Sequence, residues 1–156
     1  MGVITGNSPP VDDPVGVPLI GYHNVVTVGG IASTTEAAGF PVSNLSNHAT
    51  HLLWVGGVNT GDEYITVTTG FTDPIDYVGV ARHNWGTLGV PVSIETTDSP
   101  ATTLIGPTVL ADDSPVIFRF TPQVLSTIRI KIEVTDTSDP PEAAVVFVGK
   151  LLVLER

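Results

Sequence analysis

IRIKIEV, residues 128–134, alternates apolar and charged side chains without interruption. Successive side chains of a β-strand point to opposite faces of its sheet, so this period of two places the three isoleucines and Val134 on one face. Sliding the strand by one residue would exchange the buried and the exposed face, so its pairing register is strongly specified. The stretch therefore predicts a half-buried strand in a layered β-protein.

Seven other segments resemble it in length and are separated by clusters of Gly, Pro, Asp, Asn and Ser, a pattern typical of an all-β sandwich. IDYVGVA (75–81) and VVFVGKLLVL (145–154) are apolar at consecutive positions, as central strands covered on both faces are. Helical periodicity is limited to a single expected turn within 34–39 or 41–50. The predicted strands cover residues 23–29, 51–57, 64–70, 75–84, 90–97, 114–122, 126–136 and 143–155.

The first 18 residues differ from the rest because they are rich in glycine and proline. Proline lacks the backbone N–H that helices and inner strands use, so residues 1–18 are expected to form an extended, polyproline-like arm. Residues 19–156 are expected to form one β-sandwich domain. We interpret the arm as an assembly device that orders on a neighbouring subunit and assign this role to Pro9, Pro10, Pro14 and Pro18.

The chain has 156 residues, the size of one domain, and a formal net charge of −10. All six Lys and Arg residues follow position 81 and are not clustered, which disfavours direct binding to nucleic acid. No apolar run reaches the roughly 18 residues that a membrane span requires. The N-terminus also lacks the basic start and apolar core of a secretory signal. We therefore expect neither nucleic acid nor membrane as a partner, and synthesis in the cytoplasm of the cell that expresses the protein.

The segment RHNW, residues 82–85, is the main candidate for a functional site. His83 and Asn84 follow a strongly apolar strand, where a general base or a sugar ligand would be plausible chemistry, and Trp85 stands beside a glycine in a loop. The same residues can instead mark a corner, with His83 and Asn84 bonded to loop backbone and Trp85 covered. Both interpretations are open at this level: a glycan site made of Trp85, His83 and Asn84, or a structural turn.

Other candidates are weaker. His48 and His51 are three residues apart, but the segment is rich in Asn and Ser and offers no third ligand, so a polar loop is favoured over a metal site. The acidic pairs have no calcium-loop spacing. No phosphate-binding, nucleophile-elbow or zinc-protease motif is present. We therefore predict no catalytic residue, no metal and no cofactor, and a protein that is not an enzyme.

Several segments in order, among them GFPVSNLSNHATHLLWVGG (39–57), DPIDYVGVARHNWGTLGVPVSIE (73–95) and AAVVFVGKLLVLE (143–155), resemble a known family. The chain is similar to the discoidin-like (F5/8 type C, galactose-binding-like) jelly rolls of tailed-bacteriophage virion proteins over residues 18–155. The resemblance implies an antiparallel jelly-roll β-sandwich of about eight strands in which RHNW is the exit corner of a buried strand. The matching positions are Asn44, Leu45, Trp54, Asp76, Tyr77, His83, Asn84 and Gly149.

The resemblance, the low content of charged residues and the arm lead to a functional prediction. We expect a non-enzymatic structural component of a bacteriophage virion, attached to tail or capsid, that contacts other virion proteins and copies of itself. The alternative is a carbohydrate-binding module for host glycans, in which ligand meets loops at one end of the barrel. Exposure of Trp85 would separate the two, because a binder needs this ring in a solvent-facing concavity.

Overall fold

The alternating stretch is a strand at the centre of one of two sheets. The computed structural model describes residues 2–6, 18–98 and 101–153. Within them β10 (Thr127–Ile132) pairs on one side with β5 (Glu63–Thr68) and on the other with β7 (Pro91–Thr96), all antiparallel. Ile128, Ile130 and Ile132 have no exposed surface, which confirms the predicted alternation.

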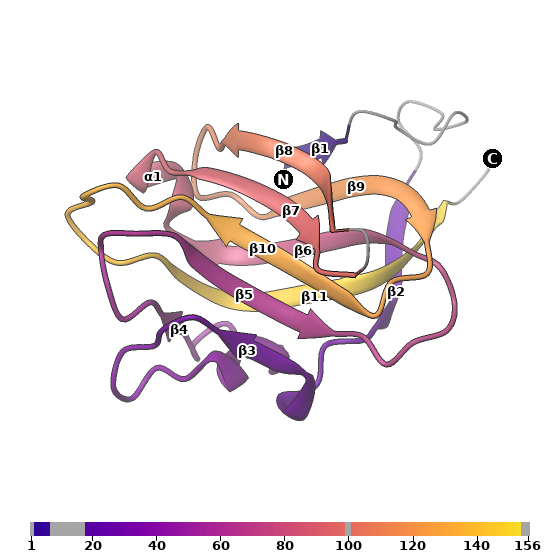
Figure 1. Cartoon of the computed structure of the whole chain (residues 1–156), viewed down its shortest axis with the longest axis horizontal. Coiled ribbons are helices and arrows are strands. Elements are labelled where there is room, and N and C mark those ends of the chain that lie inside the picture. The colour runs from indigo at the N-terminus through magenta and orange to yellow at the C-terminus, as the bar shows by residue number, and fades with distance from the viewer. Residues whose placement is uncertain (1, 7–17, 99–100, 154–156) are drawn as a thin grey trace.

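Two sheets packed face to face form the sandwich (Figure 1). Sheet B has the order β3-β5-β10-β7-β8, and sheet A has the order β1-β9-β6-β11-β2 with β4 also paired to β11. All pairs are antiparallel except β1 with β9. The other strands are β1 (Gly2–Thr5), β2 (Leu19–Asn24), β3 (Ile31–Ser33), β4 (Trp54–Val55), β6 (Ile75–His83), β8 (Thr102–Val109), β9 (Val116–Gln123) and β11 (Glu142–Val153). The predicted all-β sandwich is thus confirmed.

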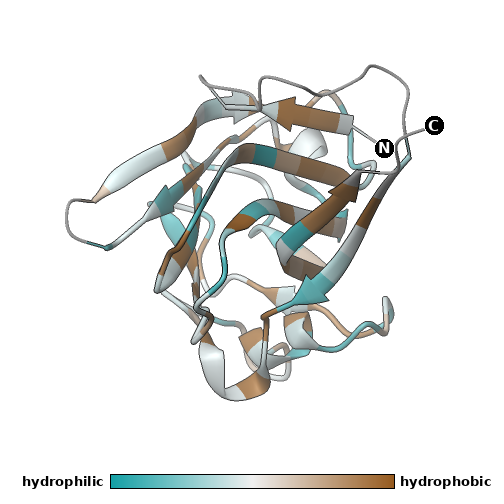
Figure 2. Cartoon of the chain, turned by 90° about the vertical axis from the view of Figure 1, so that its right-hand side faces the viewer, coloured by the Kyte–Doolittle hydropathy of each residue, from teal (hydrophilic) through white to brown (hydrophobic). Residues whose placement is uncertain are grey.

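The core lies between the two sheets and is filled by aliphatic and aromatic side chains. In Figure 2 the hydrophobic segments gather along the strands, whereas hydrophilic segments lie mainly at strand ends and in loops. β6 and β11 are inner strands of sheet A, and β6 is buried at six consecutive positions; one of them is Asp76, whose carboxylate accepts the Leu151 backbone N–H at 2.8 Å. In the described part of the chain no helix has the length and hydropathy to cross a membrane.

In the described part of the chain three short helices connect strands: η1 (Val28–Gly30), η2 (Val42–Ser46) and α1 (Trp85–Leu88). The turn expected within 41–50 is η2. The predicted strand 23–29 is wrong in its second half, because the chain leaves sheet A after Asn24 and forms η1, with Val28 68% exposed. Of the predicted strand 51–57, only Trp54–Val55 forms a strand, β4. β8 was not predicted because Gly106 and Pro107 interrupt its pattern, yet an edge strand tolerates proline.

The N-terminal arm is only partly as expected. Gly2–Thr5 is not a free arm but β1, which pairs in parallel with β9, and the flanking N–H groups of Gly2 and Gly6 donate to the carbonyls of Pro115 and Arg119 at 2.9 Å. These four residues thus extend sheet A. Pro18 is exposed. Pro9, Pro10 and Pro14 lie outside the described residues.

Deleting Gly2–Thr5 is expected to lower the free energy of unfolding by about 2 kcal/mol, because strand pairing and the packing of Ile4 against the core are lost. Urea denaturation of the deletion and the parent protein measures the difference. Val3→Thr is the control, since Val3 is 47% exposed and threonine keeps the strand intact. Equal midpoints for deletion and parent would show that β1 adds no stability to the domain.

Candidate functional site

RHNW is a corner of the sandwich, where β6 ends and α1 leads toward β7. His83 is 4% exposed, and its Nε2 lies 3.0 Å from the Ser114 carbonyl oxygen. Because a carbonyl only accepts, Nε2 carries the proton and donates, which leaves Nδ1 to accept the backbone N–H of Trp85 at 3.3 Å. Burial lowers the pKa of His83, which favours this neutral form. The imidazole thus ties the end of β6 to the loop between β8 and β9.

Asn84 has an equally structural role. Its Nδ2 donates to the Pro140 carbonyl at 3.0 Å, and its Oδ1 accepts the backbone N–H of Glu142 at 2.9 Å. The side chain thereby ties the corner to the start of β11, more than fifty residues later. A sugar would have to displace these bonds, so Asn84 is not available as a ligand-binding group.

Trp85 has no exposed surface. Its ring stacks on that of His83, with centroids 5.0 Å apart, and belongs to the main hydrophobic core. The interpretation of Trp85 as a stacking platform for a sugar is therefore wrong in this fold. Its burial does not indicate a neighbouring subunit either, because the protein's own core covers the ring. The alternative prediction from the sequence, a structural corner, describes RHNW correctly.

The corner also needs a close approach between two loops. A Cβ at Gly86 would lie 2.2 Å from the carbonyl carbon and oxygen of Asp112, so only glycine fits there. In the Asp112 loop, the Ser114 backbone N–H donates to the Asp112 carboxylate at 2.8 Å and lowers the pKa of Asp112. Thr87 is bonded to Asp113 through both its N–H and its hydroxyl. These carboxylates thus fix the loops beside α1.

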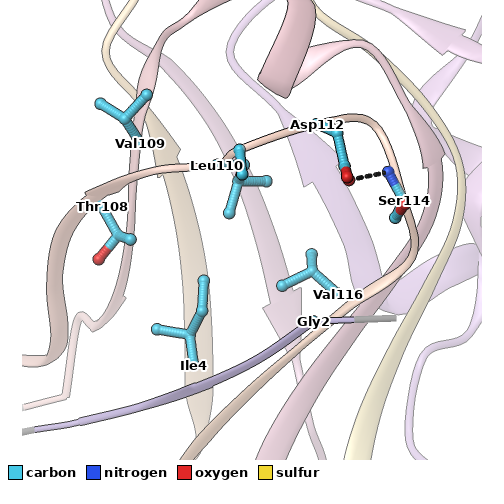
Figure 3. Close-up of a pocket in the computed structure, with 9 residues that line it drawn as sticks. Gly2, Ile4, Thr108, Val109, Leu110, Asp112, Ser114 and Val116 are labelled. Atoms are coloured by element: carbon cyan, nitrogen blue, oxygen red, sulfur yellow. Dashed lines mark hydrogen bonds between the residues drawn. The ribbon is translucent and has the colours of Figure 1, made fainter.

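The cavity of about 370 Å³ between β1, β8 and the β8–β9 loop is mainly apolar (Figure 3). Ile4, Leu110 and Val116 line it, and Asp112 and Ser114 at one end are hydrogen-bonded to each other. The Thr108 hydroxyl donates to the Gly106 carbonyl. Since its polar groups are already bonded, this cavity offers little to a hydroxyl-rich ligand.

A hollow between η1 and η2 has the opposite character. Its volume is about 340 Å³ and it is open to solvent. No Asp, Glu, Lys or Arg is among the residues that line it, and its apolar part is a single valine. We call it the η1–η2 hollow; its lining residues are Val28, Ser43, Asn44, Ser46, Asn47 and His48.

Local hydrogen bonds hold the η2 side of this hollow in place. Leu45 has no exposed surface and anchors η2 in the core. The Asn44 amide nitrogen donates to the Leu53 carbonyl at 2.7 Å, one residue before the buried Trp54. The Ser46 hydroxyl donates to the Ser43 carbonyl at 2.7 Å, and the Asn47 Oδ1 accepts the Ala49 N–H at 3.0 Å. The backbone around the hollow is thus fixed before any ligand arrives.

Three polar groups of the hollow remain unused. Among the described residues, the Ser43 hydroxyl, the Asn47 amide nitrogen and the ring nitrogens of His48 have no hydrogen-bond partner. The His48 ring lies on Phe147, with centroids 5.0 Å apart and an interplanar angle of 20°. One face of the imidazole is therefore occupied by an aromatic ring while its polar edge is free. Hydroxyl, amide and imidazole groups together both donate and accept, as sugar hydroxyls do.

None of the three predicted glycan residues lines this hollow. Sequence reasoning considered His48 only as a metal ligand, and the described residues contain no group of three His, Cys, Asp or Glu side chains that could hold a metal. Ser43 and Asn47 were not singled out. The available signal was the polar segment SNHATH (46–51) at the end of η2, whose composition is that of an ordinary loop.

Comparison with known proteins defines the fold more closely. No protein-family model and no curated protein matches the chain. Among solved structures, chitosan-binding module 1 from the chitosanase/glucanase of Paenibacillus sp. IK-5 has 18% identity and a TM-score of 0.68, covering 81% of this chain and 98% of that one. The CBM32 of AlyQ, in complex with 4,5-unsaturated mannuronic acid, has 18% identity and a TM-score of 0.63, with coverages of 81% and 98%.

A third similar structure is a CBM32 module of Clostridium perfringens in complex with GalNAc-β-1,3-galactose, with 11% identity and a TM-score of 0.64, covering 80% of this chain and 98% of that one. At such identities the likeness establishes a shared fold, the discoidin-like, galactose-binding-like jelly roll. It overturns the prediction of a virion structural component, because these neighbours are carbohydrate-binding modules rather than tail or capsid subunits. The resemblance from sequence holds for the fold and not for a phage origin.

Proposed function

We propose that the chain is a non-catalytic carbohydrate-binding module and that the η1–η2 hollow is its glycan site. The observation that carries the proposal is the set of unused polar groups of Ser43, Asn47 and His48 around a solvent-open hollow. The fold adds support, since similar structures are modules that bind chitosan, an unsaturated mannuronic acid and GalNAc-β-1,3-galactose. Those ligands belong to the neighbours and do not define the sugar bound here.

The chemistry of the hollow suits recognition of hydroxyl groups. The Asn47 amide donates, the Ser43 hydroxyl donates and accepts, and the His48 edge does either according to its tautomer. Val28, which is 68% exposed, offers an apolar contact for the C–H face of a sugar ring. Each neutral hydrogen bond contributes a net of only about 1 kcal/mol and association carries its own entropy cost, so this small set of contacts predicts weak binding of a single sugar.

Binding rather than turnover is also favoured by what surrounds the hollow. Hydrolysis of a glycosidic bond ordinarily uses two carboxyl groups on opposite sides of the scissile bond. None of the six residues that line the hollow carries a carboxylate. A ligand held there would be surrounded by hydroxyl, amide and imidazole groups, without the pair of carboxyl groups that this hydrolysis ordinarily uses.

The test is a glycan array probed with the purified protein, followed by calorimetry on the sugars retained. Asn47→Ala and His48→Ala should each weaken binding by a factor of about ten, which corresponds to about 1.4 kcal/mol. His51→Ala is the matched control, because His51 is an exposed histidine of the same loop that does not line the hollow. An array without any retained glycan, or equal affinities for all three variants, would contradict the proposal.

A further inference from the structure

Three aromatic rings outside the η1–η2 hollow form a cluster at the end of β2. Tyr22 meets His23 edge-on with centroids 4.8 Å apart, and His23 meets Phe71 with centroids 5.5 Å apart. Tyr22 is 47% exposed, His23 is exposed and Phe71 is half-buried. Large aromatic rings are usually covered in a folded domain, so two adjacent exposed rings supported by a third are a surface that needs a role.

The cluster and the hollow flank the same short helix. His23 precedes Val28, which lines the hollow, by five residues, so their Cα atoms are no more than about 18 Å apart. On the other side of η1, a Cβ built on Gly30 would lie 3.0 Å from the Thr68 carbonyl oxygen, and Phe71 follows Thr68 by three residues. The segment that carries Phe71 thus begins against η1.

Both sites also lie along one edge of β11. β2 pairs with β11 from Gly149 to Val153, and the Val25 N–H continues this contact with the Val148 carbonyl at 2.8 Å. The next residue of β11, Phe147, carries the stacked ring of His48 from the hollow. Along this edge, the aromatic cluster lies nearer the C-terminal end of β11 and the hollow lies next to it, beside Phe147.

The backbone beneath the rings is held by buried and partly buried hydrogen bonds. The Asn24 Oδ1 accepts the N–H groups of Val26 and Val148 at 3.1 and 3.2 Å, which fixes the point where the chain leaves β2. Thr69 is buried and its hydroxyl donates to the Leu125 carbonyl, two residues before Phe71. The rings are therefore presented on fixed loops, which reduces the ordering cost that binding would otherwise carry.

We propose that Tyr22, His23 and Phe71 form a second sugar subsite, so that the ligand of this protein is an oligosaccharide spanning both sides of η1 and not a single sugar. This inference rests on the proposed function of the η1–η2 hollow. A pyranose ring has an apolar C–H face that stacks on aromatic rings. None of the three residues is a Lys or Arg, the side chains that would select an anionic ligand. Two linked sugar units would each occupy one subsite, and the second contact becomes intramolecular once the first is made.

The experiment measures affinity against chain length. Calorimetry would use N-acetylglucosamine, glucosamine and galactose series, each from monosaccharide to hexasaccharide. We expect the longest oligomers of the bound series to bind at least about tenfold more tightly than the monosaccharide. The double variant Tyr22→Ala/His23→Ala should bind the hexasaccharide no more tightly than the monosaccharide, while its monosaccharide affinity stays unchanged.

Tyr64→Ala is the control, because this half-buried ring lies under Arg129 on the outer face of sheet B and belongs to neither subsite. It should retain the full dependence on length. If all oligomers bind the parent protein equally, or the double variant keeps the dependence, the second subsite is overturned while the hollow stands. If no series binds and the array is also empty, the proposed function itself fails.

Discussion

Trp85→Ala is expected to lower the free energy of unfolding by about 3–5 kcal/mol, the range for deleting a buried aromatic ring. Trp85 has no exposed surface and stacks on His83, so the smaller side chain leaves a cavity beneath the corner. The backbone of the corner is held by Asn84 and Gly86, which limits its collapse into that space. Urea denaturation followed by circular dichroism measures the loss without relying on tryptophan fluorescence.

Measuring both the stability and the glycan affinity of Trp85→Ala distinguishes a role of Trp85 in the core from a role in binding. Under conditions where Trp85→Ala remains folded, its affinity for glycans should equal that of the parent protein, because Trp85 does not line the η1–η2 hollow. Tyr22→Ala is the matched control on stability, since an exposed ring should change it by less than about 0.5 kcal/mol. A stable Trp85→Ala protein that no longer binds sugar would restore Trp85 as the platform and refute the site proposed here.

The inner strands were predictable from sequence, and the edges were not. In β10 and β5 buried and less buried side chains alternate, because one face of each strand packs on the core and the other faces water. The sequence alternates with the same period, so it predicts these strands. β8 is mostly exposed and carries Gly106 and Pro107, so burial leaves little pattern in it. The segment from Val25 to Gly29 is apolar enough for a strand. However, the pairing of β2 with β11 ends at Asn24, and the chain forms η1 instead.

The candidate site was harder to foresee because its residues are ordinary one by one. Val28 lies in η1 and His48 in the loop after η2, and only tertiary packing brings both to the hollow. Ser43 and Asn47 are common loop residues with no spacing rule for sugar binding. In contrast, RHNW attracts attention because histidine, asparagine and tryptophan are chemically versatile. Only the long-range bonds to Ser114, Pro140 and Glu142 show that this versatility is used for structure.

Gly149→Ala is the second substitution with a large expected effect. A Cβ at Gly149 would lie 1.5 Å from the His23 carbonyl oxygen and 2.7 Å from its carbon, so β2 and β11 cannot keep their present spacing. The pairing already shifts register between Gly149 and Leu151. Because the obstacle is backbone and not a flexible side chain, we expect a loss of about 3 kcal/mol in the free energy of unfolding.

Gly79→Ala is the matched control in the neighbouring strand β6, where the nearest atom to an added Cβ is Phe147 Cβ at an ordinary 3.6 Å. It should change stability by less than about 1 kcal/mol. The contrast also bears on ligand length, since the strand displaced by Gly149→Ala carries Tyr22 and His23. The alanine protein, where folded, should bind monosaccharides normally and lose the added affinity for oligosaccharides. Equal behaviour of the two variants would mean that β2 does not pack this closely on β11, and the aromatic subsite would lose its foundation.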